Sequence, residues 1–239
     1  MSNIKDVMFF SDGFELKGSL HLPSTHRPPF VIGSHGLCSS SSSPKQIALA
    51  DQCNRLGIAY FRFDHRGCGR SAGEFEEVTS LEARCRDLTD AVSVISGRTD
   101  IGDRFGLFGS SMGGSVCLSV ATDLGAKTLV TFAAPIRSRF LEKRLPIFKN
   151  SGNPPNFLDT PKRRFDITRR LPEISSILIF HGEADEVVPV SHAEEIHNLV
   201  KPPKKLIKQK QGDHPMSDKA HQKVFIREAS LWFRQRLNA

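Results

Sequence analysis

The sequence predicts an α/β fold: a mostly parallel, twisted sheet of about eight strands with helices on both faces. Two observations carry this prediction. Short apolar stretches alternate with amphipathic stretches about five times along the 239 residues, as in sheets whose strands are joined by crossover helices. The chain also opens with two apolar stretches joined by the turn signal Ser11-Asp12-Gly13, which predicts an antiparallel hairpin.

The predicted strands are short apolar runs bounded by glycine, proline or polar residues. In chain order they cover residues 6–10, 14–23, 29–36, 58–64, 104–110, 126–135, 177–185 and 204–212. The predicted helices have apolar residues at helical spacing and cover residues 43–57, 80–97, 112–125, 191–200 and 218–237. Start and stop signals support the first of them, since Pro44 lies in its first turn and Gly57 just past its end.

Composition narrows the class of protein. Hydrophobic residues make up 38% and charged residues 25% of the chain, which favours a packed core over global disorder. The net charge of +7 favours an anionic partner or substrate without identifying one. Apolar runs fall far short of the roughly 20 residues that span a bilayer, and the first residues lack the pattern of a secretory signal. Five scattered cysteines without a C-x-x-C pair predict free thiols in the cytoplasm and no metal site.

A candidate nucleophile lies between a predicted strand and a predicted helix. Gly109-Ser110-Ser111-Met112-Gly113 fits the pattern G-x-S-x-G in the context that this pattern requires. A serine on such a turn has strained backbone geometry, and side chains two residues before and after it would clash. Of the nearby serines, only Ser111 has glycine at both places, so it is the predicted nucleophile. The alternative is a glycine-rich turn required only for packing; a phosphate loop is excluded because no lysine follows the glycines.

A serine hydroxyl needs a base to take its proton and an acid to orient that base. On this architecture the chain order is serine, acid, histidine. Asp185 and His214 each follow a predicted strand, so we expect them at the same sheet edge as Ser111. The weaker candidates are Glu183 and Asp213 as the acid and His221 as the base, and we interpret His181 as structural.

A developing oxyanion needs donors that are in place before the reaction. The backbone N–H of Met112 begins the helix after the nucleophile, and the N–H of Leu37 follows the strand at 29–36. We expect these two groups to form an oxyanion hole; the alternative for Leu37 is an ordinary strand-to-helix turn.

Residues 138–173 interrupt the alternation of strands and helices and contain nine lysines and arginines. A connection this long is usually a lid or a disordered insert. We expect a small cap within a single domain spanning residues 1–239, with Arg163 and Arg164 as candidates for binding anionic acyl groups or an anionic membrane surface. The alternative is a solvated basic loop.

Two further patterns are weak. Residues 67–72 fit the dinucleotide fingerprint G-x-G-x-x-G/A, but no helix begins within the motif, so we expect a structural loop. The basic runs at 161–164 and 201–205 lack interleaved aromatic residues, so we expect no nucleic-acid partner.

Five motifs together carry a resemblance: SHGLCSS, FDHRGCGRS, GSSMGG, HGEADEVVP and GDHP. In order and spacing, from about residue 14 to 235, they resemble the α/β-hydrolase fold. They are most similar to cytosolic serine esterases of the cinnamoyl/feruloyl esterase and serine-aminopeptidase-like (monoacylglycerol-lipase-like) group. The resemblance implies Ser111, Asp185 and His214 as a catalytic triad, Leu37 and Met112 as oxyanion donors, and the insert as a cap. The chain departs from the group in its short cap and in Pro215, which directly follows His214.

We therefore expect a serine hydrolase that cleaves small or medium acyl or aryl carboxylic esters through an acyl-enzyme, without a metal or organic cofactor. Its partner would be a small-molecule ester, with no integral membrane segment, and a homodimer is left open. The alternatives are a peptidase or thioesterase that uses the same residues, and a catalytically inactive ligand-binding protein on the same fold.

Overall fold

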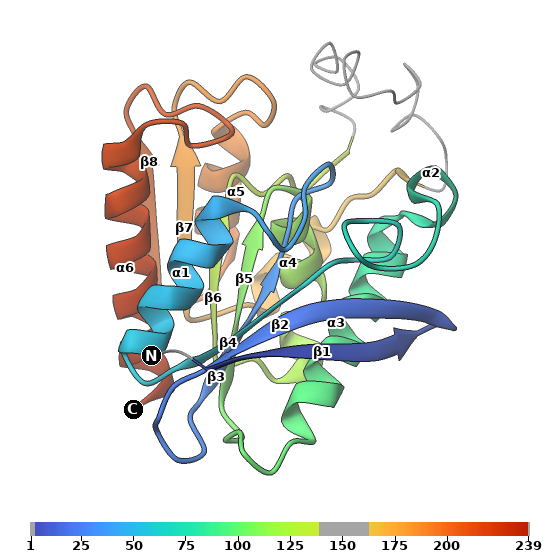
Figure 1. Cartoon of the computed structure of the whole chain (residues 1–239). Helices are drawn as coiled ribbons and strands as arrows, with labels where there is room; N and C mark the ends of the chain where they lie inside the picture. The colour runs from blue at the N-terminus through green and yellow to red at the C-terminus, as the bar shows by residue number, and fades with distance from the viewer. Residues whose placement is uncertain (1–2, 139–162, 239) are drawn as a thin grey trace.

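An eight-stranded sheet organises the computed structural model, which describes residues 3–138 and 163–238 (Figure 1). The strand order is β1-β2-β4-β3-β5-β6-β7-β8. β2 is antiparallel to both of its neighbours, and all other neighbouring strands pair in parallel. The strands are β1 (Asn3–Ser11), β2 (Phe14–Leu22), β3 (Phe30–Ser34), β4 (Ala59–Phe63), β5 (Phe105–Ser110), β6 (Thr128–Phe132), β7 (Ile177–Gly182) and β8 (Lys204–Gln209). The predicted fold class and the opening hairpin are confirmed.

The strand ends differ from the prediction for local reasons. β1 begins at Asn3 rather than at residue 6, because its register pairs Asn3 with Leu22 even though its first four residues are exposed. β6 ends at Phe132 rather than at residue 135, because Ala133 has a φ of 52°, which cannot continue a strand.

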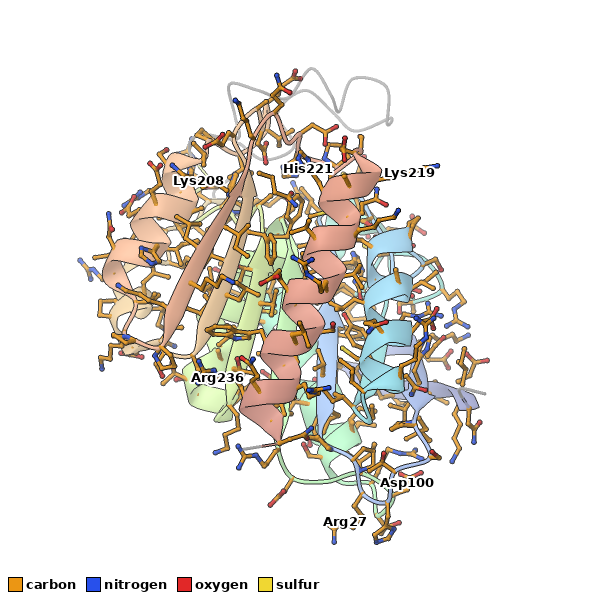
Figure 2. The ribbon with its side chains drawn as sticks, turned by 90° about the vertical axis from the view of Figure 1, so that its left-hand side faces the viewer. Arg27, Asp100, Lys208, Lys219, His221 and Arg236 are labelled. Carbon is orange, nitrogen blue, oxygen red and sulfur yellow. The ribbon has the colours of Figure 1, made fainter. Side chains whose placement is uncertain are left out.

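Helices cover both faces of the sheet. They are α1 (Pro44–Arg55), α2 (Phe75–Val78), α3 (Leu81–Ser96), α4 (Met112–Leu124), α5 (Ser191–Leu199) and α6 (Lys219–Leu237), with the 3-10 helix η3 (Thr168–Glu173) before β7. α1 and α6 pack side by side on one face, as Figure 2 shows with Lys219 and Arg236 marking the two ends of α6. α3, α4 and α5 contribute to the apolar layer on the other face. The short elements α2 and η3 were not predicted, since neither is long enough to show helical periodicity.

This layering brings the carboxyl ends of the parallel strands to one edge of the sheet, where ligands bind in folds of this kind. Most of the predicted cap, residues 139–162, lies outside the described residues. Within the described part of the chain, none of the helices is long and apolar enough to cross a membrane. The same residues contain no cluster of three or more histidine, cysteine, aspartate or glutamate side chains suited to hold a metal ion.

Candidate active site

Ser111 lies on the sharp turn between β5 and α4. Its backbone has φ 53° and ψ −124°, a conformation that is costly for a residue with a side chain. Two hydrogen bonds hold the turn: the Ser111 N–H donates to the carbonyl of Phe132 at 2.7 Å, and its carbonyl accepts from the N–H of Gly114 at 2.8 Å. The side chain is half-buried. The turn therefore holds the hydroxyl at the sheet edge in the strained geometry that the motif predicts.

The glycines on either side of Ser111 are required by close backbone contacts. A Cβ at Gly109 would lie 2.5 Å from the Cα of Gly114, and a Cβ at Gly113 would lie 2.7 Å from the carbonyl oxygen of His35. Both distances are far inside normal van der Waals contact of about 3.5 Å. Glycine at these two positions therefore lets α4 begin directly against β5 and the end of β3.

Asp185 and His214 meet Ser111 at this edge. The Nε2 atom of His214 lies 3.1 Å from Ser111 Oγ, and its Nδ1 lies 2.7 Å from Asp185 Oδ2. The histidine side chain is 20% exposed, whereas the carboxylate is fully buried. In this arrangement His214 can accept a proton from Ser111 at one nitrogen while donating to Asp185 from the other.

The loops that carry Asp185 and His214 are joined through their backbones. The N–H of Ala184 donates to the carbonyl of Gly212 at 3.0 Å. A Cβ at Gly182 would lie 3.1 Å from the Cα of Gly212, so both glycines allow this approach. The contact places Asp185, which follows β7, next to His214, which follows β8.

Asp185 is held as a carboxylate by several donors. Its Oδ1 accepts from the N–H groups of Val187 at 2.8 Å and Val188 at 2.7 Å. The Nε2 atom of His181 lies 3.4 Å from its Oδ2 and also donates to the carbonyl of Val188 at 2.8 Å. Burial alone would raise the pKa of Asp185, but hydrogen bonds from His181 and His214 outweigh it and hold the pKa well below its usual range. His181, interpreted from the sequence as structural, thus directly supports the Asp185 carboxylate.

The other candidate acids and bases have different partners. Asp213 Oδ1 accepts from the N–H of Ser217 at 2.7 Å, and Glu183 lies 4.0 Å from Lys208. His221 lies in the first turn of α6, near the Lys219 end, as labelled in Figure 2. Of these histidines, His214 is the one whose ring nitrogen lies within hydrogen-bond distance of Ser111 Oγ.

Leu37 and Met112, the predicted oxyanion donors, belong to the two backbone segments beside Ser111. Met112 is the first residue of α4, so its N–H has no acceptor within the helix. Leu37 follows Gly36, and a Cβ at Gly36 would lie 3.5 Å from the Cβ of Ser111. Among the described residues, the N–H of Leu37 donates to no protein atom. Both N–H groups are therefore available near Ser111.

A second Ser–His–Asp chain lies in the interior. Ser34 Oγ is 2.8 Å from His65 Nε2, and His65 Nδ1 is 3.2 Å from Asp87 Oδ2. All three side chains are fully buried, so a substrate cannot reach this serine. The Asp87 carboxylate also binds the guanidinium of Arg66 at 2.7 Å. This chain is a structural network that ties the ends of β3 and β4 to α3.

Residues 67–72, the weak dinucleotide match, form a loop organised by Asp64. Asp64 Oδ2 accepts from the N–H of Arg70 at 3.1 Å, and its backbone carbonyl accepts from Ser71 Oγ at 2.6 Å. Gly69 has a φ of 53° and lies where a Cβ would overlap the Asp64 carboxyl group. The carboxylate therefore occupies the space inside the loop.

The structure gives Arg163 and Arg164 different surroundings. Arg163 is buried, and its guanidinium donates to the backbone carbonyl of Glu76 in α2. Arg164 is exposed. Arg163 thus supports α2, and a role for either arginine in substrate binding stays a prediction.

Sequence reasoning missed the buried polar residues behind the site. Arg84 and Asp87 lie three residues apart on α3, among its buried residues. A signal was present in the sequence, because charged residues placed on the apolar stripe of a helix are rarely buried without partners. Their partners could not be identified, since nearly all of them lie in the loops that follow β3 and β4, far from α3 in sequence.

Solved structures with the same fold include known esterases. The esterase Pf2001 from Pyrococcus furiosus superimposes with a TM-score of 0.83 at 18% identity, covering 99% of this chain and 92% of that one. Est1E from Butyrivibrio proteoclasticus, solved with ferulic acid bound, superimposes with a TM-score of 0.77 at 19% identity, covering 98% and 100%. At these identities the likeness establishes the α/β-hydrolase fold alone.

Sequence relatives extend over most of the chain. The mitochondrial palmitoyl-protein thioesterase ABHD10 of Mus musculus is 27% identical over 240 residues, covering 90% of this chain and 79% of that protein. The uncharacterized protein YfhR of Escherichia coli (strain K12) is 28% identical over 217 residues, covering 85% and 70%. The family model for serine aminopeptidase, S33, matches residues 26–149, which include the motif around Ser111. The chain is a member of this serine aminopeptidase S33 family of α/β-hydrolases.

Proposed function

We propose that this chain is a serine hydrolase that cleaves carboxylic esters through an acyl-enzyme on Ser111. One observation carries the proposal: a continuous hydrogen-bond chain runs from the half-buried Ser111 hydroxyl through His214 to the buried Asp185 carboxylate. These hydrogen-bonded side chains lie at the carboxyl edge of the sheet, where substrates reach folds of this class. The interior chain that ends on Ser34 has the same hydrogen bonds but no access to solvent.

In the acylation step, the two ring nitrogens of His214 have different roles. Nε2 takes the proton of Ser111 Oγ as the oxygen attacks the ester carbonyl, and the ring becomes positively charged. Asp185 stabilises that charge and holds the tautomer that keeps Nε2 free to accept, because its carboxylate accepts from Nδ1 at 2.7 Å. The N–H groups of Leu37 and Met112 would bind the carbonyl oxygen as it becomes an oxyanion.

The attack of Ser111 Oγ forms a tetrahedral intermediate. This intermediate breaks down when His214 gives its proton to the departing alcohol, and an acyl group is left on Ser111. A water molecule then takes the alcohol's place, loses a proton to His214 and attacks the acyl carbon. The carboxylic acid departs, and Ser111 regains its proton.

A thioesterase is the second candidate, favoured by the 27% identity to the palmitoyl-protein thioesterase ABHD10 over 90% of the chain. The same residues serve either reaction, because only the leaving group changes from an alcohol to a thiol. The two candidates therefore differ in the leaving group that the site accepts.

Covalent labelling tests the proposal. A fluorophosphonate probe is expected to label the parent chain at Ser111, with no labelling of Ser111→Ala. The neighbouring Ser110→Ala is the matched control and is expected to be labelled like the parent, since Ser110 lacks the contact with His214. Absence of labelling in the parent, or labelling that survives Ser111→Ala, would refute the proposal.

A substrate panel then separates the ester and thioester candidates. It compares p-nitrophenyl esters of increasing chain length, feruloyl esters, S-acyl peptides and aminoacyl anilides. Higher kcat/KM on the oxygen esters supports the carboxylesterase, and higher kcat/KM on S-acyl peptides of the same acyl chain supports the thioesterase. Preference for the anilides would instead identify a peptidase.

A further inference from the structure

Arg84 is a fully buried arginine that holds the loop beside Ser111. Its Nη1 donates to the carbonyl oxygens of His35 and Gly36, each at 3.3 Å, and its Nη2 donates to that of Leu37 at 3.0 Å. Its Nε donates to Thr79 Oγ1 at 3.1 Å, which anchors the guanidinium through its third nitrogen. One side chain of α3 thus binds three successive carbonyls of the loop that follows β3.

These contacts determine where the N–H of Leu37 points. The Gly36 carbonyl and the Leu37 N–H belong to one planar trans peptide group, in which C=O and N–H point in opposite directions. Because Arg84 binds the carbonyl, the N–H is directed away from α3. Nδ1 of His35 donates to the same carbonyl at 2.7 Å, which fixes this peptide from a second direction. The peptide lies beside Ser111, since a Cβ at Gly36 would be 3.5 Å from that of Ser111.

The charge of Arg84 acts on the same peptide. Among the described residues, its contacts are carbonyls, the Thr79 hydroxyl and Cys68 Sγ, and none is a carboxylate within ion-pair distance. A guanidinium stays protonated in proteins, so positive charge lies behind the loop without a contacting anion. A cation that binds the carbonyl oxygen polarises the peptide and strengthens its N–H as a donor.

We propose that Arg84 is a positioning residue of the oxyanion hole: by binding the 35–37 carbonyls it directs and polarises the N–H of Leu37. This inference rests on the proposed hydrolase function and deepens it. Arg84 would act only when charge develops on the substrate oxygen, so its removal should affect the transition state more than ground-state binding.

The test compares Arg84→Met with Arg86→Met. Arg86 lies two residues further along α3, is 54% exposed and pairs with Asp12, so its replacement removes the same charge outside the site. Kinetics use a p-nitrophenyl ester. Binding is measured for an aryl trifluoromethyl ketone, which forms a tetrahedral oxyanion on serine, and for the matching alcohol, which cannot.

Arg84→Met is expected to lower kcat by about 10- to 100-fold. This decrease is no larger than the decrease that follows removal of an oxyanion donor itself. Trifluoromethyl ketone affinity should fall by a similar factor, while KM and alcohol affinity change by less than about twofold. Arg86→Met should match the parent. Equal loss for the ketone and the alcohol, or unchanged kcat, would overturn the proposal.

Arg84→Lys decides the question if Arg84→Met does not fold. Lysine keeps the charge and most of the stem, but one ammonium cannot span three carbonyls as the planar guanidinium does. For Arg84→Lys we expect kcat and ketone affinity to be about 10-fold below those of the parent. This loss is smaller than the loss expected when an oxyanion donor is removed outright. Values within about twofold of the parent would refute the assignment.

A readout that does not need turnover separates this proposal from the proposed function. In a chain labelled with ¹⁵N-leucine, the Leu37 amide resonance is expected to shift in Arg84→Lys far more than the other leucine amides, and not in Arg86→Met. If the parent is inactive but Leu37 shifts, the hydrolase function fails and the positioning by Arg84 stands. If the parent is active and Leu37 does not shift, Arg84 is not a positioning residue.

Discussion

Gly113→Ala probes the closest contact in the candidate site. The atom nearest to the added Cβ would be the carbonyl oxygen of Ser34. The Cβ would also lie 2.6 Å from the carbonyl carbon of Ser34 and 2.7 Å from the carbonyl oxygen of His35, and all three are backbone atoms. These distances are ~0.8 Å shorter than the ~3.5 Å at which non-bonded atoms attract. The first turn of α4 must therefore move away from the end of β3. This movement separates the N–H of Met112 from that of Leu37, the two proposed oxyanion donors.

The size of the effect follows from that displacement. Overpacking of this kind costs about 1–3 kcal/mol of stability. Alanine has a better helix propensity than glycine, which offsets about 1 kcal/mol of this loss of stability. A displacement approaching 1 Å between catalytic groups lowers activity by about 100-fold. We therefore expect a large loss of kcat/KM with a modest loss of stability.

Gly125→Ala is the matched control. Gly125 ends the same helix with a φ of +72°, and a Cβ there would meet no atom within 4 Å. Its replacement costs about 1–2 kcal/mol because alanine disfavours this conformation, but nothing near Ser111 moves. Stability is measured by urea unfolding, followed through the fluorescence of the single tryptophan, Trp232, which is 8% exposed. Activity is measured as kcat/KM on a p-nitrophenyl ester. If both variants have the same kcat/KM, the steric reasoning is wrong.

Two further predictions concern the two Ser–His–Asp chains. Asp185→Asn should lower kcat by roughly 10⁴-fold, because an amide no longer holds the required tautomer of His214. The control Asp213→Asn, on the same loop as His214, should have little effect. Similar losses of kcat for the two variants in the ester assay would contradict the assignment of Asp185 as the acid. Burial lowers the pKa of His65 from 6.5 to about 4, so its NMR resonances should show a neutral ring at about pH 5, and a titration near 6.5 would count against this. Because the unfolded chain binds this proton below about pH 6.5 and the folded chain does not, His65 should reduce stability by up to about 2 kcal/mol at pH 5. Burial also lowers the pKa values of His35 and His192, so these rings add to the fall in stability that the urea midpoint measures.

Local rules were enough to predict the sheet and the turn that carries the candidate nucleophile, Ser111. The alternation of apolar strands with amphipathic helices follows from burial on both faces, so all eight strands and the five longer helices were predicted, apart from their ends. Ser111 could be chosen among its neighbours because the need for glycine two residues to either side is a local steric requirement, which the contacts of Gly109 and Gly113 confirm. Four-residue α2 and the 3-10 helix η3 have no such periodicity and were missed.

The partners of Ser111 were a different kind of prediction. His214 lies 103 residues from Ser111 and 29 from Asp185, and chain order together with strand ends was the available guide to them. The three side chains lie together because parallel strands bring their carboxyl ends to one edge, so residues distant in sequence become neighbours.

By itself, the sequence determined the alternating layers, the strained turn at Ser111 and the order of candidate residues, because each follows from spacing or local sterics. Only the tertiary structure decided which Ser–His–Asp chain can meet a substrate. Ser34, His65 and Asp87 make the same hydrogen bonds as Ser111, His214 and Asp185, yet they are fully buried. Only the folded chain could also show that Arg84 binds the loop beside Ser111, because burial and the direction of a peptide group depend on contacts between elements that are distant in sequence.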